Sequence, residues 1–248
     1  MVYQNFAYFY DELMSHAPYD QWTQLTKDVI DENGLIEPSI VDLGCGTGEI
    51  TLRLTGLSKN ITGVDYSAEM LAVAMNKATE QQKHINWVQQ DIKELTGFKN
   101  VDLMISYCDV INYLTTTDDV DRVFKHVYHS LNNSGVFVFD IHSQEYILEN
   151  FIGKTFADVS EDTAYIWDCY SGDKLGAMEH EITFFVKNQN ETYKKIIENH
   201  FQQVFTKDFY LESLEKAGFK DIKIRANFDL KTDKLTKEVD RFFIIAKK

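Results

Sequence analysis

The stretch Ile40-Val41-Asp42-Leu43-Gly44-Cys45-Gly46-Thr47-Gly48-Glu49 decides the fold of this chain. It begins as a short apolar run rich in β-branched residues and passes into three glycines at alternate positions, after which a helical pattern starts at Glu49. This order predicts a strand, a tight turn and a helix. Because glycine has no Cβ, the turn lets a ligand approach the backbone closely. The start of the helix offers free N–H groups to a carboxylate or a phosphate.

Outward from this turn, short apolar segments alternate with helical ones. Strands separated by helices indicate parallel crossovers, and near-continuous apolar strands are typical of a sheet covered on both faces. We therefore predict an α/β, Rossmann-like fold with a seven-stranded, mainly parallel sheet and helices on both faces. A turn is expected at 132–134. The expected strands are 40–43, 61–64, 85–88, 101–105, 135–140, 222–226 and 242–246, and the expected helices are 5–14, 19–33, 49–55, 68–79, 118–131 and 207–217.

The pattern changes between about Ser143 and Phe205, where three long strand-like segments follow one another without intervening helices. The segments 164–170, 180–186 and 193–205 are expected to be strands, with a turn at 187–190 between the last two, and such a series predicts an antiparallel meander. We expect residues 1–143 and 206–248 to form a cofactor-binding core. Residues 144–205 would then form an inserted β lid that carries the substrate specificity.

The overall charge argues against nucleic acid as a partner. The chain of 248 residues has 25 basic and 39 acidic side chains, a formal net charge of -14. Affinity for nucleic acid depends mostly on phosphate neutralisation by clustered Lys and Arg, whereas the lysine-rich stretches 194–195 and 231–237 are interleaved with acidic residues. No apolar run approaches the roughly 18 residues of a membrane span, and a signal peptide is not recognisable. We expect a cytoplasmic protein without membrane association.

The cysteines and histidines do not predict a metal site. Cys45, Cys108 and Cys169 are far apart, and no C-x-x-C pair occurs. His126 and His129 share a helix face, but no further ligand lies near them in the sequence, so we predict no metal. The sequence gives no indication of the oligomeric state.

The glycine turn has to be distinguished from a dinucleotide site, whose fingerprint is G-x-G-x-x-G. Gly44 and Gly46 fit, but Glu49 occupies the position of the third glycine. A diphosphate would also lie close to Asp42 and Glu49, and the turn has no Lys or Arg to offset them. Like charges in a partly desolvated pocket are unfavourable. A ligand with an ammonium and a sulfonium group avoids this conflict.

Val41 to Gly48 resembles motif I of the class I S-adenosylmethionine-dependent methyltransferases, a strand ending in Asp or Glu before G-x-G-x-G. In that family an acidic residue after the second strand accepts both ribose hydroxyls, and Asp65 matches it. The resemblance implies S-adenosylmethionine as the cofactor. The residues that it implies in cofactor binding are Asp42, Gly44, Cys45, Gly46, Gly48, Asp65, Tyr66, Met70, Gln90, Asp91, Ile92, Tyr107 and Cys108.

The N-terminal stretch 3–11 is similar to that of bacterial small-molecule methyltransferases, which begin with an aromatic-rich helix and carry a sheet insertion after the fifth strand. We expect Phe6 and Phe9 to pack on the core. Tyr10 and Trp22 are expected to close over the methionine end of the cofactor, because an aromatic face stabilises a nearby cation by about 0.5–2 kcal/mol.

Methyl transfer from a sulfonium depends mainly on alignment, and a base is needed only if the acceptor must lose a proton. His142 is the first candidate base, because an unperturbed histidine pKa of about 6.5 suits the task. Asp109 is expected to act at the same site, where it would instead bind a cationic acceptor. His180 and His200 on the predicted lid are weaker candidate bases. The expected substrate contacts are Asn112, Tyr113, Tyr165, Trp167 and His180.

The acceptor is expected to be a small molecule, and the sequence does not distinguish methylation of nitrogen, oxygen or carbon. Two other functions remain open at this point. One is an NAD(P)-dependent oxidoreductase, which the fold class allows and the charges of Asp42 and Glu49 disfavour. The other is a non-catalytic S-adenosylmethionine-binding regulatory protein, because methyl transfer requires no fixed nucleophile whose absence would exclude catalysis.

Overall fold

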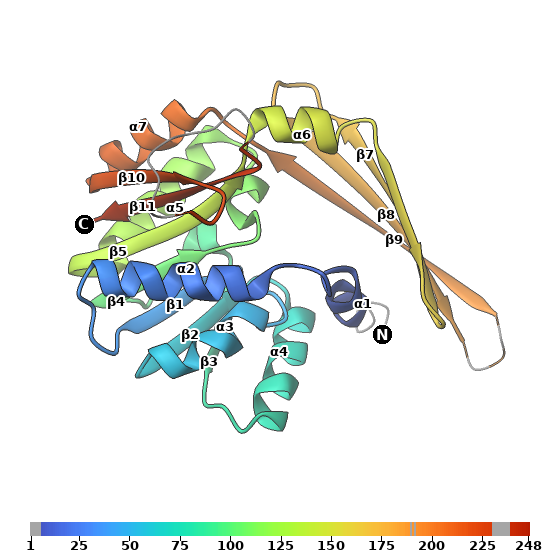
Figure 1. The fold of residues 1–248 in the computed structure, drawn as a ribbon, viewed down its shortest axis with the longest axis horizontal. Helices are drawn as coiled ribbons and strands as arrows, with labels where there is room; N and C mark the ends of the chain where they lie inside the picture. Colours follow the sequence, from blue (N-terminus) through green and yellow to red (C-terminus); the bar gives the residue numbers. More distant parts are fainter. Residues whose placement is uncertain (1–5, 189, 191, 230–238) are drawn as a thin grey trace.

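The computed structural model describes residues 6–188, 190, 192–229 and 239–248 (Figure 1). Three segments discussed above lie wholly or partly outside the described residues: the lysine-rich stretch 231–237, the N-terminal residues 3–5 and part of the predicted turn 187–190. No helix in the described part of the chain is long and apolar enough to cross a membrane.

A seven-stranded sheet forms the centre of the fold, in the order β10-β11-β5-β4-β1-β2-β3. Neighbouring strands from β3 to β5 are parallel, whereas β11 is antiparallel to both β5 and β10. The prediction of a mainly parallel, Rossmann-like sheet is therefore confirmed. Its strands are β1 Ser39–Leu43, β2 Asn60–Asp65, β3 Asn86–Gln89, β4 Val101–Ser106, β5 Leu131–His142, β10 Lys220–Ala226 and β11 Arg241–Lys247.

Helices cover both faces of this sheet, as expected from the crossovers (Figure 1). On one face, Phe124 and Tyr210 anchor α5 and α7 in an apolar cluster, and on the other Leu25 and Ile50 anchor α2 and α3. The helical segments are α1 Phe6–Leu13, α2 Tyr19–Glu32, α3 Glu49–Leu54, α4 Ala68–Glu80, α5 Thr117–Ser130 and α7 Lys207–Ala217, with short 3-10 segments η1 Thr55–Leu57, η2 Ile92–Glu94 and η3 Val110–Tyr113.

The fifth strand differs from its prediction. Residues 132–134, expected to form a turn, lie within β5. Val101 pairs with Leu131 and Leu103 pairs with Val136, so β5 holds extra residues against β4 at this point. Asn132 keeps the irregular segment in place, because its Nδ2 donates a hydrogen bond to Asp102. Polar turn-forming residues are thus accommodated as a bulge at the start of the strand.

A separate four-stranded antiparallel sheet, here called the roof sheet, follows β5 and a short helix, α6 Gln144–Asn150. The predicted meander is confirmed, with one strand more than expected. The additional strand β6 is an edge strand whose side chains are mostly exposed, so it lacks the apolar alternation that marks a strand in a sequence. The strands are β6 Thr155–Val159, β7 Thr163–Ser171, β8 Ala177–Lys187 and β9 Tyr193–Gln203.

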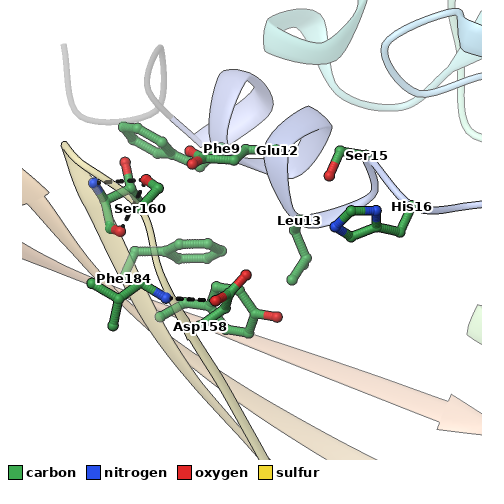
Figure 2. A pocket seen from close by; sticks show the side chains of 11 residues that line it. Phe9, Glu12, Leu13, Ser15, His16, Asp158, Ser160 and Phe184 are labelled. Atoms are coloured by element: carbon green, nitrogen blue, oxygen red, sulfur yellow. Dashed lines mark hydrogen bonds between the residues drawn. The ribbon is translucent and has the colours of Figure 1, made fainter.

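The roof sheet extends from the core sheet past the N-terminal helix (Figure 1). Phe9 of α1 stacks on Phe184 of β8 with 6.0 Å between the ring centroids, and Figure 2 shows this contact beside a small pocket. Phe9, expected to pack on the core, packs instead against the roof sheet. The side chain of Phe6, expected to pack in the same way, lies outside the described part of the structure. Helix α1 links the roof sheet to the cofactor side of the core, because Thr47 Oγ1 donates a hydrogen bond of 2.5 Å to Asp11.

Candidate functional site

A cavity of about 890 Å³ lies beyond the carboxyl ends of β1, β2, β3 and β4. The strand order reverses between β1 and β4, the place where open α/β sheets bind their ligands. The cavity lining continues onto α1 and α2 with Tyr10 and Tyr19, and onto β9 of the roof sheet with Glu198 and His200. The cavity therefore has a core side and a roof side.

The predicted glycine turn forms part of the core side. The backbone N–H groups of Gly44 and Cys45 donate to Val64 O, at 2.7 and 3.0 Å, and tie the turn to β2. A Cβ on Gly44 would lie 2.4 Å from Val110 Cγ1, so the turn packs tightly there. A Cβ on Gly46 would meet no atom within 4 Å. The backbone at Gly46 thus lies bare at the cavity, as close approach of a ligand requires.

Asp65 connects this turn to the next crossover. Its Oδ2 accepts the N–H of Gly46 at 2.8 Å, and its Oδ1 accepts the N–H of Ser67, also at 2.8 Å. Burial raises the pKa of Asp65, although these hydrogen bonds favour its charged form. An ionised carboxylate has about four acceptor sites, so both oxygens retain capacity for a ligand in the cavity.

Asp42, at the end of β1, is buried in the cavity wall and accepts a hydrogen bond of 2.6 Å from Thr51 Oγ1. Burial raises its pKa to about 7, and the hydrogen bond from Thr51 only partly offsets this. Asp42 is therefore poised to exchange a proton near neutral pH. A cation placed beside it would favour the ionised form.

Glu49 has two cationic partners, Arg53 one helical turn later on α3 and Lys77 on α4. It pairs with Arg53, and its Oε1 lies 2.7 Å from Lys77 Nζ on α4. Burial alone would raise the pKa of Glu49, but these two partners lower it below the usual value. The turn itself has no Lys or Arg, as predicted, but the charge of Glu49 is offset from outside the turn by Arg53 on α3 and Lys77 on α4. Asp42 and Asp65, in contrast, form no ion pair with a Lys or Arg among the described residues.

The other end of the core side is formed by residues after β2 and β3, including Tyr66, Met70 and Ile92. Asp91 Oδ1 accepts the N–H of Lys93 at 2.9 Å and thereby begins the segment η2. The Gln90 side chain is occupied by Thr96, which it contacts through both amide atoms.

Most of the predicted cofactor residues are brought together in the lining of this one cavity. Gly48 and Trp22 are the two that do not line it. Gly48 begins α3 with φ +79°, and a Cβ there would lie 2.8 Å from Trp87. Those that line the cavity are Tyr10, Asp42, Gly44, Cys45, Gly46, Asp65, Tyr66, Met70, Gln90, Asp91, Ile92, Tyr107 and Cys108.

Trp22, expected near the cofactor, does not line the cavity, because its ring is buried in the core. Its Nε1 donates a hydrogen bond of 2.7 Å to Asp140 Oδ2. The guanidinium carbon of Arg241 lies 5.3 Å from the Trp22 ring, and Phe228 packs edge-on to it at 5.0 Å. Trp22 therefore supports the buried end of β5 rather than the cofactor cavity.

Neither Asp109 nor His142 lines the cavity, so their expected roles stay predictions. Arg241 Nη1 and Nη2 bind the two oxygens of Asp109, and His142 Nε2 lies 3.0 Å from Asp109 Oδ2. Burial alone would raise the pKa of Asp109, but Arg241 and His142 lower it well below the ordinary range. Asp109 is thus neutralised within the protein. His142 Nδ1 contacts Asp240 O at 3.3 Å, so both of its ring nitrogens have partners.

The predicted substrate residues separate into two groups. Tyr113 lines the cavity, whereas Asn112 is fully buried and does not. Trp167 Nε1 donates a hydrogen bond of 3.0 Å to His180 Nδ1 inside the roof sheet, and burial lowers the pKa of His180 to about 4. Tyr165 lines the smaller pocket beneath α1. These last three side chains hold the roof sheet together.

Glu198 is a cavity residue that the sequence analysis did not select. It lies two positions before His200 on β9, and alternate residues of a strand point to the same face. The buried and exposed positions of β9 alternate accordingly. Because His200 was already a candidate, this period-two pattern could have identified Glu198 as a second residue on the same face of β9. Among the described residues, no group of three or more His, Cys, Asp or Glu side chains is arranged to hold a metal ion.

Comparisons with known proteins agree with this geometry. Residues 40–135 match the family model described as "Methyltransferase domain". The chain is 43% identical to the Bacillus subtilis protein named "Putative methyltransferase YqeM", over 92% of this chain and 90% of that protein. It is 38% identical to a Geobacillus protein of the same designation, with both chains covered in full.

The fold is similar to that of solved methyltransferase structures. An S-adenosylmethionine-dependent methyltransferase from Clostridium acetobutylicum superposes with a TM-score of 0.88 at 29% identity, covering 100% of this chain and 99% of that one. An amino pentose methyltransferase from Micromonospora echinaspora, solved with S-adenosylmethionine bound, superposes with a TM-score of 0.76 at 16% identity, covering 97% and 95%. With the glycine turn and the acidic strand ends in one cavity, the chain belongs to the class I S-adenosylmethionine-dependent methyltransferases.

Proposed function

We propose that this cavity binds S-adenosylmethionine, with the amino-acid part at the glycine turn and the nucleoside between Asp65 and Asp91. The observation that carries this assignment is the contact between Asp65 and Gly46. One carboxylate there fixes the bare backbone of the turn and still has acceptor capacity for the ribose hydroxyls. Asp42 suits the cationic end, because it lies in the same wall without a basic partner among the described residues.

When bound, S-adenosylmethionine supplies an electrophilic methyl group and a neutral thioether as the leaving group. The residues of the chain then have to hold the acceptor in line with that methyl and keep other nucleophiles away. Orientation of this kind is worth about 7–11 kcal/mol. Tyr10 and Tyr19 line the cavity between the glycine turn and the roof sheet, and burial raises the pKa of both phenols, so both stay neutral. Their rings suit a positively charged ligand.

We propose further that the acceptor is a small molecule. Sites for drug-sized ligands measure roughly 300–1,000 Å³, so a cavity of about 890 Å³ has room for a cofactor and a small acceptor together. In this proposal, residues 1–143 and 206–248 bind the cofactor, and residues 144–205 select the acceptor through β9. A cytoplasmic location fits a protein that uses this metabolite.

Titration calorimetry with Asp65→Asn tests the cofactor site. We expect the variant to bind S-adenosylmethionine at least ~100-fold more weakly, because hydrogen bonds to a charged group contribute about 1.5–3 kcal/mol each. Asp118→Asn, at an exposed position on α5, serves as the control and should bind like the unmodified protein. Unchanged affinity in Asp65→Asn, or tight binding of NAD in place of S-adenosylmethionine, would contradict the proposal.

A further inference from the structure

The roof side of the cavity holds a carboxylate in an apolar and aromatic setting. Glu198 and His200 both belong to the cavity lining, together with Tyr113 and Leu114 of the core. His200 Nδ1 lies 3.2 Å from the Tyr113 hydroxyl, and the two rings meet edge to face. This contact joins β9 to the core, and Glu198 lies on the roof side of the cavity.

The charges that line the cavity are strongly unequal. Lys93 is the one Lys or Arg among the lining residues, and it lies 3.5 Å from Asp91. An acceptor that carries a phosphate or a carboxylate would meet no uncommitted cation in this lining. The lining carboxylates number six: Asp42, Glu49, Asp65, Glu69, Asp91 and Glu198.

Like Asp42, Asp65 and Glu69, Glu198 has no ion pair within the described part of the chain, but among the six lining carboxylates it is the one on the roof side. Glu49 is paired with Lys77, and Asp91 with Lys93, whereas Glu198 forms no ion pair with any residue that the structure describes. It is partly buried, and this burial raises its pKa. Burial also lowers the pKa of His200, which therefore stays neutral and does not supply the missing positive charge. A carboxylate in this setting is stabilised by a cation from outside the protein.

We infer that the methyl acceptor is a small amine, and that Glu198 binds it in its ammonium form. This inference rests on the proposed cofactor site and adds the class of substrate. The ammonium first gives one proton to the Glu198 carboxylate. The nitrogen lone pair then forms the N–C bond to the methyl carbon while the C–S bond breaks and its electron pair stays on sulfur. The product is a methylated ammonium, so the positive charge moves from sulfur to nitrogen.

The inference is tested by binding rather than by turnover. The protein is first loaded with S-adenosylhomocysteine, which shows whether the cofactor site works, and is then titrated with benzylammonium, benzyl alcohol and benzoate by calorimetry. These probes share one ring and differ in charge. We expect benzylammonium to bind at least roughly tenfold more tightly than the alcohol, as a charge-assisted hydrogen bond requires, and benzoate to bind weakest.

Glu198→Gln should reduce the preference for the ammonium over the alcohol to less than about threefold, with unchanged affinity for S-adenosylhomocysteine. Glu181→Gln is the matched control, because Glu181 belongs to the roof sheet but does not line the cavity. It should keep the preference. Equal binding of ammonium and alcohol, or a preference that survives in Glu198→Gln, would overturn the amine assignment. Failure to bind S-adenosylhomocysteine would instead overturn the cofactor site, and with it this inference.

Discussion

Arg241 and Asp109 form a two-point ion pair, with Nη1–Oδ1 and Nη2–Oδ2 distances of 2.6 and 3.0 Å, although 132 residues separate them. Arg241 Nη1 also lies 2.8 Å from Asp140 Oδ2, and Asp140 Oδ1 accepts the N–H of Asp109 at 3.1 Å. Cys108 and Asp109 have φ of +59° and +65°, an unfavourable conformation for residues with a Cβ. The ion pair therefore holds a strained turn that carries Cys108 into the cavity wall.

We expect Arg241→Met to lower the free energy of unfolding by about 3–5 kcal/mol, because it leaves two buried carboxylates without their cation. Urea denaturation measures this loss. Arg122→Met is the control, since Arg122 pairs with Glu94 at an exposed position and should cost less than about 1 kcal/mol. Similar losses in the two variants would show that the buried pair is not needed for stability.

Changing Gly44 or Gly46 to alanine is expected to affect different properties, mainly the stability for Gly44 and mainly the cofactor affinity for Gly46. Both have positive φ and share a backbone cost of about 1–2 kcal/mol. Gly44→Ala should lose roughly 1–3 kcal/mol more, because its Cβ meets Val110. Gly46→Ala should keep more stability and lose cofactor affinity, since its Cβ would project into the cavity. Denaturation and calorimetry on both variants separate these effects, and wild-type cofactor affinity in Gly46→Ala would contradict the assignment.

Cofactor binding should release protons near pH 7. With its pKa at about 7, Asp42 is partly protonated there in the free protein. A sulfonium or ammonium beside it lowers that pKa, so the carboxyl gives up its proton on binding. Calorimetry in buffers with different ionisation enthalpies measures the number of protons. Asp42→Asn should abolish the release, and proton uptake by the unmodified protein would show that the sign is wrong.

Trp22→Phe should weaken the fold without weakening the cofactor site. The substitution removes the hydrogen bond to Asp140, and a buried bond to a charged group contributes about 1.5–3 kcal/mol. We expect that loss of unfolding free energy, measured with urea, and an unchanged affinity for S-adenosylmethionine at a temperature where the variant is folded. A selective loss of affinity in a fully stable variant would restore Trp22 to the cofactor site.

The sequence predicted the core sheet and the cofactor side of the cavity because both depend on local order. A strand, a glycine turn and a helix follow one another at 40–49, Asp65 ends β2 and Asp91 lies two positions past the end of β3, so parallel pairing brings the two aspartates to one edge. The roof side was less predictable. Glu198 enters the cavity through the register of β9 against β8, a relation between distant segments that residue type does not reveal.

Asp109 and His142 stay outside the cavity lining for a common physical reason. Asp109 follows β4 and His142 ends β5, as functional residues in this fold do, but Arg241 on β11, which pairs with β5, binds Asp109 directly. The antiparallel pairing of β11 with β5 places Arg241 opposite His142. Without that register, a neutralised carboxylate and an available one look the same in the sequence.

The position of β11 between β5 and β10 also bears on synthesis by the ribosome. The turn, the acidic strand ends and the whole roof sheet are translated before residue 241. Until that arginine emerges, Asp109 and Asp140 have no cation to bury against, and the turn that carries Cys108 lacks its restraint. A nascent chain can therefore fix the Cys108–Asp109 turn in the cavity wall only after all the residues that line the cavity have been made.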